Sequence, residues 1–324
     1  MLQNAELHLI LQFLNKFSPN HLVTDSAFNL QERKMSDFQK QTVQWFPGHM
    51  AKTRRLIKES LGRVDCVTEV LDARIPFASR NPEIEEITSG KPRIVLLNKC
   101  DLADEAVTAA WVKYFRSHGA EAMPVDCRSG RGLNNFHSVV RKLLADKIQA
   151  NNDRGMVGKA LRVMVIGIPN TGKSSFINKM AGRVRAKVAD KPGVTTSNQW
   201  FFIGNGIELL DTPGVLWPKF DDPVVGDKLA FIGSVKDAVL DVETMAVRLI
   251  DVLREGYPER LKERYKIDNF EDLQSWEILE LIGRKRGMLI SGGEIDTERA
   301  SVMLLDEYRG GRLGRISLEF PPKE

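Results

Sequence analysis

The stretch that decides the fold is Gly167-Ile-Pro-Asn-Thr-Gly-Lys-Ser174, which follows an apolar run and precedes a helical stretch. Its spacing is that of a phosphate-binding loop, in the required strand–loop–helix context. Gly167 and Gly172 allow backbone N–H groups to turn inward around phosphates, and Lys173 offers positive charge to the β- and γ-phosphates. The Ser174 hydroxyl suits Mg²⁺. A glycine-rich turn without a ligand is the alternative interpretation.

The phosphate loop (residues 167–174) predicts further nucleotide contacts from residues inside it and just after it. The N-terminus of the following helix adds partial positive charge to the site. We therefore expect contacts to a bound nucleotide from Pro169, Asn170, Thr171 and Ser175.

Short β-branched runs alternate with helical stretches through the first two thirds of the chain. We expect strands at residues 64–71, 93–97, 122–125, 161–166, 200–203 and 207–210, and helices at 106–117 and 133–147. This alternation predicts an α/β fold whose sheet is mostly parallel, with helices on both faces. After about residue 225 the pattern is helical, at 242–254, 273–283 and 298–308. We expect an arm at 1–38, a nucleotide-binding domain at 39–225 and a helical domain at 226–324.

Composition excludes several classes of protein. The chain has 324 residues, a net charge of +4, 42% hydrophobic and 28% charged residues, which is typical of a soluble globular protein and excludes a disordered or collagen-like chain. Its three cysteines predict reduced thiols. We find no apolar run of membrane-spanning length and poor signal and transit peptides, so we expect a cytoplasmic protein. The arm is either an upstream start-codon reading, with Met35 as the start, or a helical partner-binding segment.

Asp211-Thr-Pro-Gly214 follows the strand at 207–210 and predicts a sensor of the γ-phosphate. An Asp at a strand end can hold the water shell of Mg²⁺, and Gly214 can bring its backbone N–H to the γ-phosphate. A threonine between this sensor segment (residues 211–214) and the phosphate loop should complete the metal site. Thr195 is our first choice and Thr196 our second. A plain turn is the alternative.

Asn98-Lys-Cys-Asp101 follows another buried strand and predicts recognition of guanine. Guanine presents N1–H and an amino group side by side, and the Asp101 carboxylate can accept both. Asn98 can brace the neighbouring loops, and the Lys99 stem can cover the base. A second base-contacting segment is expected at Asp126, Cys127 and Arg128.

The order of these motifs is unusual. In ordinary GTPases the phosphate loop comes first, whereas here residues 98–101 precede it by about seventy residues. A circular permutation explains the order without changing the fold, because domain termini often lie close together. The sensor segment also runs almost directly into the helical domain, so a ligand that orders it could reposition that domain.

This motif order, together with Trp45-Phe-Pro-Gly-His-Met-Ala-Lys52 and the C-terminal Tyr308-Arg-Gly-Gly-Arg-Leu-Gly-Arg315, resembles the circularly permuted GTPases of the RbgA/YlqF family. The resemblance covers about residues 42–320. It implies GTP and GDP binding with Mg²⁺, slow hydrolysis stimulated by the maturing large ribosomal subunit, and a helical domain that contacts RNA. The chain departs from the family at Asp126, where Ser is usual.

The residue after the sensor segment is Val215, which cannot orient an attacking water as glutamine does in Ras. The resemblance suggests His49 for this role, so we expect His49, Lys173 and Gly214 to be catalytic. The alternative is that His49 packs under Trp45 and Phe46. Asn170 matches a residue of potassium-activated GTPases, which makes K⁺ a second candidate cation. It could equally be an ordinary loop residue.

Basic residues gather in four places. These are Lys52, Arg54, Arg55, Lys58 and Arg63; Arg183, Arg185, Lys187 and Lys191; Arg284 to Arg286; and Arg309, Arg312 and Arg315. Each cluster could be solvated surface, but together with the resemblance they favour RNA contact. The expected partner is a large-subunit precursor, its rRNA and ribosomal proteins, with no membrane partner and a monomeric chain. The competing hypotheses are a P-loop kinase or ATPase and a GTP-dependent scaffold acting on another RNA or protein.

Overall fold

The computed structural model describes residues 50–182, 199–214, 216, 222–235 and 241–322. Residues 42–324 form one compact unit. Several sequence predictions lie outside the described residues: the arm at 1–38, Trp45, Phe46, His49, Thr195, Thr196, Val215 and the basic cluster at 183–191. In the part of the chain that is described, no helix is both long and apolar enough to span a membrane.

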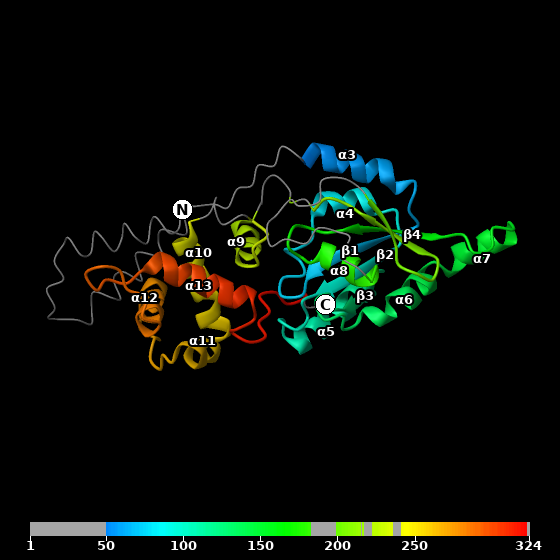
Figure 1. Cartoon of the computed structure of the whole chain (residues 1–324). Helices are drawn as coiled ribbons and strands as arrows, with labels where there is room; N and C mark the ends of the chain where they lie inside the picture. The colour runs from blue at the N-terminus through cyan, green and yellow to red at the C-terminus, as the bar shows by residue number, and fades with distance from the viewer. Residues whose placement is uncertain (1–49, 183–198, 215, 217–221, 236–240, 323–324) are drawn as a thin grey trace, which may run out of the picture. The chain divides into compact units, whose positions relative to one another are not determined.

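In the described residues, six strands form one sheet in the order β3-β2-β1-β4-β6-β5. Figure 1 labels four of them, β1 to β4. The bounds of the six strands are β1 Cys66–Asp72, β2 Arg93–Asn98, β3 Glu121–Pro124, β4 Leu161–Ile166, β5 Gln199–Phe202 and β6 Ile207–Asp211. All neighbours pair in parallel except β5 and β6, which are antiparallel. The short turn Gly204-Asn-Gly206, with three positive φ angles, joins that pair. The predicted, mostly parallel sheet is confirmed.

Helices cover both faces of the sheet, as predicted. The helices of this part are α3 Met50–Leu61, α4 Pro82–Thr88, α5 Glu105–Ser117, α6 Phe136–Leu143, α7 Ala145–Asp153 and α8 Lys173–Met180. One hydrophobic cluster joins α6 and α8 to alternate residues of β1, β2, β4 and β6. Two others place α3, α4 and α5 on the opposite face. The alternation arises because successive strand side chains point to opposite faces.

The structure corrects some helix predictions. The single helix expected at 133–147 is a 3-10 turn at Leu133–Asn135, then α6 and α7, with the break at Leu144. The sequence reading also missed α4, which begins at Pro82 after the cap residue Asn81, whose side chain accepts from the N–H groups of Glu83 and Ile84. Such short helices carry too little apolar periodicity to stand out, and their caps are their main signal.

The C-terminal part is helical, with α9 Pro223–Phe231, α10 Val242–Gly256, α11 Pro258–Tyr265, α12 Ser275–Lys285 and α13 Thr297–Arg309. Helices α10, α12 and α13 pack against one another. The expected domain boundary at 225/226 falls inside α9, and the division into two domains stays a prediction. After α13 the chain returns to the sheet, where Leu318 N donates to Arg74 O at 2.8 Å and Trp111 Nε1 donates to Glu319 O at 3.1 Å.

Candidate nucleotide-binding site

The phosphate loop connects the end of β4 to the start of α8, and two of its glycines are required by close contacts. Gly172 has φ +96°, and a Cβ added there would lie 2.1 Å from the Asn98 side-chain nitrogen. A Cβ on Gly167 would lie 2.7 Å from Val70 O. Any other residue would push the loop away from its neighbours, so the glycines allow the backbone to form the tight turn that the motif predicts.

Lys173 begins α8 and lies beside the last residue of β6. Its Nζ is 3.2 Å from Asp211 Oδ1, and both side chains are buried. Ser174 and Ser175 follow in the first turn of α8, where backbone N–H groups have no partner within the helix. The structure therefore brings the predicted phosphate-binding lysine, the predicted metal-binding Asp211 and the N-terminus of a helix to one place.

The sensor segment is held against the phosphate loop. Thr212 Oγ1 donates to Val165 O of β4 at 2.7 Å. A Cβ added to Gly214 would lie 3.3 Å from both Gly167 O and Pro169 N. Gly214 is thus packed on the phosphate loop, and its contact with the γ-phosphate stays a prediction.

Asn98 links three segments that are distant in sequence. It ends β2, its Nδ2 donates to Thr171 O of the phosphate loop at 2.6 Å, and its Oδ1 accepts from Cys127 N at 2.9 Å. One buried amide therefore fixes the guanine-recognition segment (residues 98–101) against the phosphate loop and the second base segment (residues 126–128).

Lys99 adds a second link to the phosphate loop. Its Nζ donates to Asn170 O at 2.7 Å and lies 3.0 Å from Asp72 Oδ2. Burial lowers the pKa of Lys99, opposed by the negative charge of Asp72. Burial alone would raise the pKa of Asp72, but Arg74 and Lys99 outweigh it and hold that pKa below its usual range. Asp101, the predicted guanine acceptor, is exposed at the end of this segment.

The residues of the second base segment form hydrogen bonds within the protein. Asp126 Oδ1 accepts from Arg128 N at 2.8 Å, and Cys127 N is bonded to Asn98. Burial works to raise the pKa of Asp126, but hydrogen bonds from Ser129 and Arg128 outweigh it and lower that pKa. The Asp that replaces the usual Ser thus caps its own turn. A base contact from Asp126, Cys127 or Arg128 stays a prediction, and it would have to share or replace these hydrogen bonds.

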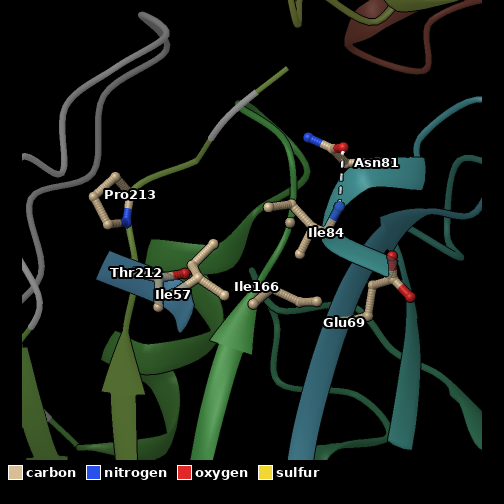
Figure 2. A pocket seen from close by; sticks show the side chains of 8 residues that line it. Ile57, Glu69, Asn81, Ile84, Ile166, Thr212 and Pro213 are labelled. Carbon is tan, nitrogen blue, oxygen red and sulfur yellow. Dashed lines mark hydrogen bonds between the residues drawn. The ribbon is translucent and has the colours of Figure 1, made fainter. Parts of the chain in front are cut away.

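A pocket beside the phosphate loop is lined by Gly167 and Ile166 at the end of β4, Thr212 and Pro213 of the sensor segment, Glu69 of β1, Ile57 of α3, and Asn81 and Ile84 at the start of α4 (Figure 2). Helix α3 therefore contacts the same cavity as the sensor segment. Since α3 begins at Met50, the residue after His49, the chain carrying the predicted catalytic histidine leads directly into this helix.

Sequence reasoning missed several buried residues around the site. Burial raises the pKa of Glu69, opposed by Arg80 and Arg93, and Arg93 Nη1 lies 3.2 Å from its carboxylate. Asp72, the last residue of β1, and Arg74, two residues later, are fully buried. An acid inside an apolar strand and an Asp-x-Arg pair at its end are unusual, because buried charges need partners. These charged residues within and just after an apolar run were the sequence feature that could have indicated a buried charge cluster.

The basic clusters differ in exposure. Arg284 and Lys285 are exposed at the end of α12, as is Arg312 after α13. Arg286 and Arg315 are also exposed but are ion-paired, with Glu307 at 3.6 Å and Glu105 at 2.9 Å. Arg309, in contrast, donates to Phe231 O at 3.1 Å and Ala230 O at 2.9 Å at the end of α9. Its guanidinium is hydrogen-bonded within the protein, so Arg309 is not a free surface charge that supports the prediction of RNA contact.

Comparisons with known proteins place the site in context. The model of a family described as 50S ribosome-binding GTPase matches residues 162–280. The match begins in β4 and leaves out residues 98–101, which precede β4 in this chain. Ribosome biogenesis GTPase A of Bacillus cereus is 45% identical over 280 residues, covering 86% of this chain and 94% of that protein. The Thermotoga maritima protein of the same name is 34% identical, covering 86% and 95%.

Mitochondrial ribosome-associated GTPase 1 of Ictalurus punctatus is 32% identical, covering 89% of this chain and 96% of the relative. Among solved structures, GDP-bound TM YlqF has a TM-score of 0.60 at 31% identity and covers 82% of this chain and 98% of its own. GNP-bound YlqF from T. maritima has a TM-score of 0.58 at 32% identity, covering 84% and 100%.

Proposed function

Because this chain belongs to the family of ribosome biogenesis GTPase A, we propose that it is a GTPase that acts late in assembly of the large ribosomal subunit. Hydrolysis is slow in the free protein and is stimulated by the maturing particle. The observation that carries the proposal is the convergence of the phosphate loop, the sensor segment and the guanine-recognition segment on the same sheet edge, linked by Asn98 and by the Lys173–Asp211 pair.

The residues at the site fit a guanine nucleotide with Mg²⁺. The glycines let the loop form its tight turn, Lys173 would supply positive charge to the phosphates, and Asp211 and Ser174 carry oxygen ligands of the kind that Mg²⁺ prefers. We assign Ser174, Thr195 and Asp211 to the metal and Gly214 N–H to the γ-phosphate. A Mg²⁺ ion held by these oxygens would supply positive charge that offsets the charge of the phosphates.

We assign orientation of the attacking water to His49. Imidazole can orient water or accept its proton near neutral pH. The position of α3 supports this assignment: Ile57 touches the pocket that Gly167 and Pro213 also line. The start of α3 at Met50 lies seven residues earlier, about 10 Å along the helix axis at 1.5 Å per residue. Closure of this region on the particle would bring His49 to the γ-phosphate.

Potassium is a further proposed cation, through Asn170. The Asn170 side chain donates through Nδ2 to Gly233 O at 2.5 Å. A K⁺ ion would take oxygen ligands, and the Asn170 amide carries an oxygen of that kind.

The rRNA contact is proposed for the exposed basic ends of α12 and the segment after α13, with the chain acting as a cytoplasmic monomer. Phosphate contacts would make binding weaken steeply with salt. A kinase or ATPase is disfavoured by Asp101, which selects guanine, and the family argues against a scaffold for another target.

Sedimentation of a cell extract with the full-length chain tests the proposal. With a non-hydrolysable GTP analogue the protein should co-migrate with large-subunit precursors, and with GDP it should stay in the free fraction. His49→Ala should co-migrate equally but lose particle-stimulated turnover. An absence of ribosomal association with either nucleotide would remove the proposal, and unchanged stimulated turnover of His49→Ala would remove the role of His49 alone.

A further inference from the structure

We propose that Asp72 and Arg74 are positioning residues for the guanine nucleotide, and that they couple the guanine-recognition segment to the last turn of α13. This presupposes that residues 98–101 bind guanine, as proposed above. It adds a route between nucleotide and helical region that is separate from the sensor segment.

Asp72 is the centre of a fully buried charge cluster at the end of β1. Arg74 Nε donates to Asp72 Oδ1 at 2.9 Å, and Arg74 Nη2 donates to Oδ2 at 2.8 Å. Lys99 Nζ lies 3.0 Å from the same Oδ2. Because the side chains of Asp72 and Arg74 are almost completely excluded from water, neither charge can be hydrated if its partner is lost.

The backbone conformation of Lys99 needs a stabilising contact of the kind that Asp72 provides. It has φ +59°, a left-handed conformation that a side chain with a Cβ adopts at a cost. Its Nζ is shared between Asp72 and Asn170 O of the phosphate loop. Asp72 therefore fixes Lys99, whose stem is proposed to cover the base. Asp72 is not itself among the residues proposed to contact the nucleotide.

Arg74 extends the cluster to the helical region. Its Nη1 donates to Tyr308 O at 3.2 Å, and its guanidinium lies 5.0 Å from the centroid of the Tyr308 ring. Carbonyls in the last turn of a helix carry partial negative charge, so this site favours a cation. One arginine thus joins Asp72, and through it Lys99, to the end of α13.

The next residue of α13 reaches the phosphate loop by a second path. Arg309 binds the carbonyls that end α9. Just beyond α9, Gly233 O accepts from Asn170, and Ser234 Oγ donates to Pro169 O at 2.7 Å. Both nucleotide loops therefore connect to the same turn of α13. If a nucleotide orders these loops, the turn should be stabilised too, and by linkage the docked turn should tighten nucleotide binding.

Release of fluorescently labelled GDP from the full-length chain is the first test. Asp72→Asn keeps the shape but removes the charge that holds Lys99, so GDP should dissociate about tenfold faster or more. The matched control is Asp227→Asn, which breaks another largely buried ion pair, Asp227–Arg248 at 2.7 Å between α9 and α10. Its dissociation rate should match the wild type. A rate for Asp72→Asn equal to that of the control would overturn the positioning role.

Hydrogen exchange at the Gly310 and Gly311 amides tests the coupling. In the wild type, saturating GDP should slow exchange there as well as in the phosphate loop. Arg74→Lys keeps a positive charge but loses the bidentate fork. GDP should then protect the phosphate loop as in the wild type but protect these amides clearly less, because only the path through Arg309 and α9 remains. This variant also carries the test should Asp72→Asn fail to fold. GDP-independent exchange at Gly310 and Gly311 in the wild type would refute the coupling.

These outcomes separate the positioning role from the proposed function. If Asp101→Asn does not alter base preference, the assignment of the guanine-recognition segment fails. If it does alter base preference while Asp72→Asn behaves as wild type, only the role of Asp72 and Arg74 fails.

Discussion

At the scale of single residues, the proposed selectivity for guanine would depend on one exposed carboxylate, that of Asp101, and on the groups that hold its segment in place. Asn98 and Lys99 are both bonded to the phosphate loop, whereas Asp101 is left facing solvent at the end of the segment. The two kinds of residue should therefore behave differently on substitution. A change at Asp101 should alter which base binds, and a change at its neighbours should alter how tightly any base binds.

Asp101→Asn should change the base preference of the protein from guanine to xanthine. The carboxylate accepts from two donors of guanine, whereas an amide can donate to the 2-oxo group of xanthine and accept from its N1–H. Loss of a charge-assisted pair should weaken GDP binding by about 10–100-fold. Competition of GDP and XDP against a labelled nucleotide measures both effects. Equal loss of affinity for the two bases would contradict a direct contact.

At the scale of elements, the phosphate loop depends on how closely β2 approaches α8. Gly172 combines a positive φ with a Cβ position that the Asn98 amide occupies. The same amide holds Thr171 O and Cys127 N, so a displaced Asn98 would disturb three segments together. The effects of the positive φ and of the occupied Cβ position can be separated, because other glycines have a positive φ but open space where a Cβ would lie.

Gly172→Ala should abolish nucleotide binding and lower the free energy of unfolding by about 1–3 kcal/mol, from backbone strain and a displaced buried amide. Gly158→Ala is the control, since Gly158 has φ +76° but nothing within 4 Å of an added Cβ. It should show only the strain cost and keep normal GDP affinity. Urea unfolding and a nucleotide-binding titration distinguish the two. Normal binding by Gly172→Ala would show that the loop tolerates displacement of Asn98.

At the scale of the whole molecule, the last residues of the described chain fasten the helical region to the sheet. The Glu319 carboxylate accepts from Phe77 N at 2.7 Å and Ala78 N, and Lys228 Nζ of α9 lies 3.0 Å from it. Its own carbonyl accepts from Trp111 of α5. A single residue after α13 thus joins elements from three parts of the sequence.

Glu319→Ala should lower the free energy of unfolding by about 2–4 kcal/mol, because two backbone N–H groups and a lysine lose a buried acceptor. The adjacent Phe320→Ala removes a side chain that is 67% exposed and should change it by less than about 0.5 kcal/mol. Chemical unfolding followed by tryptophan fluorescence measures both. A similar small effect for both variants would show that the tail contributes little to holding the parts together.

Much of the site could be predicted because its motifs are local. The phosphate loop, Asn98–Lys99–Asp101 and Asp211–Gly214 each follow a buried strand, and the ends of parallel strands meet at one sheet edge. The links between these motifs could not be predicted. Arg74 reaches Tyr308 across more than two hundred residues, and the inward turn of Arg309 depends on where α9 ends. The helix at 133–147 was wrong because periodicity does not reveal a break at Leu144.

The strand order has a consequence for how the chain is made. Strands β1 to β3 are contiguous in sequence and occupy one half of the sheet, and β4 to β6 occupy the other half. A single parallel seam, from Cys66–Val163 to Glu69–Ile166, joins them. During synthesis the half with Asn98 and Asp101 leaves the ribosome first, before the phosphate loop exists. The residues proposed to bind guanine and those proposed to bind phosphate therefore come together only when this seam closes. A nucleotide that contacts both sets should stabilise the pairing of the two halves.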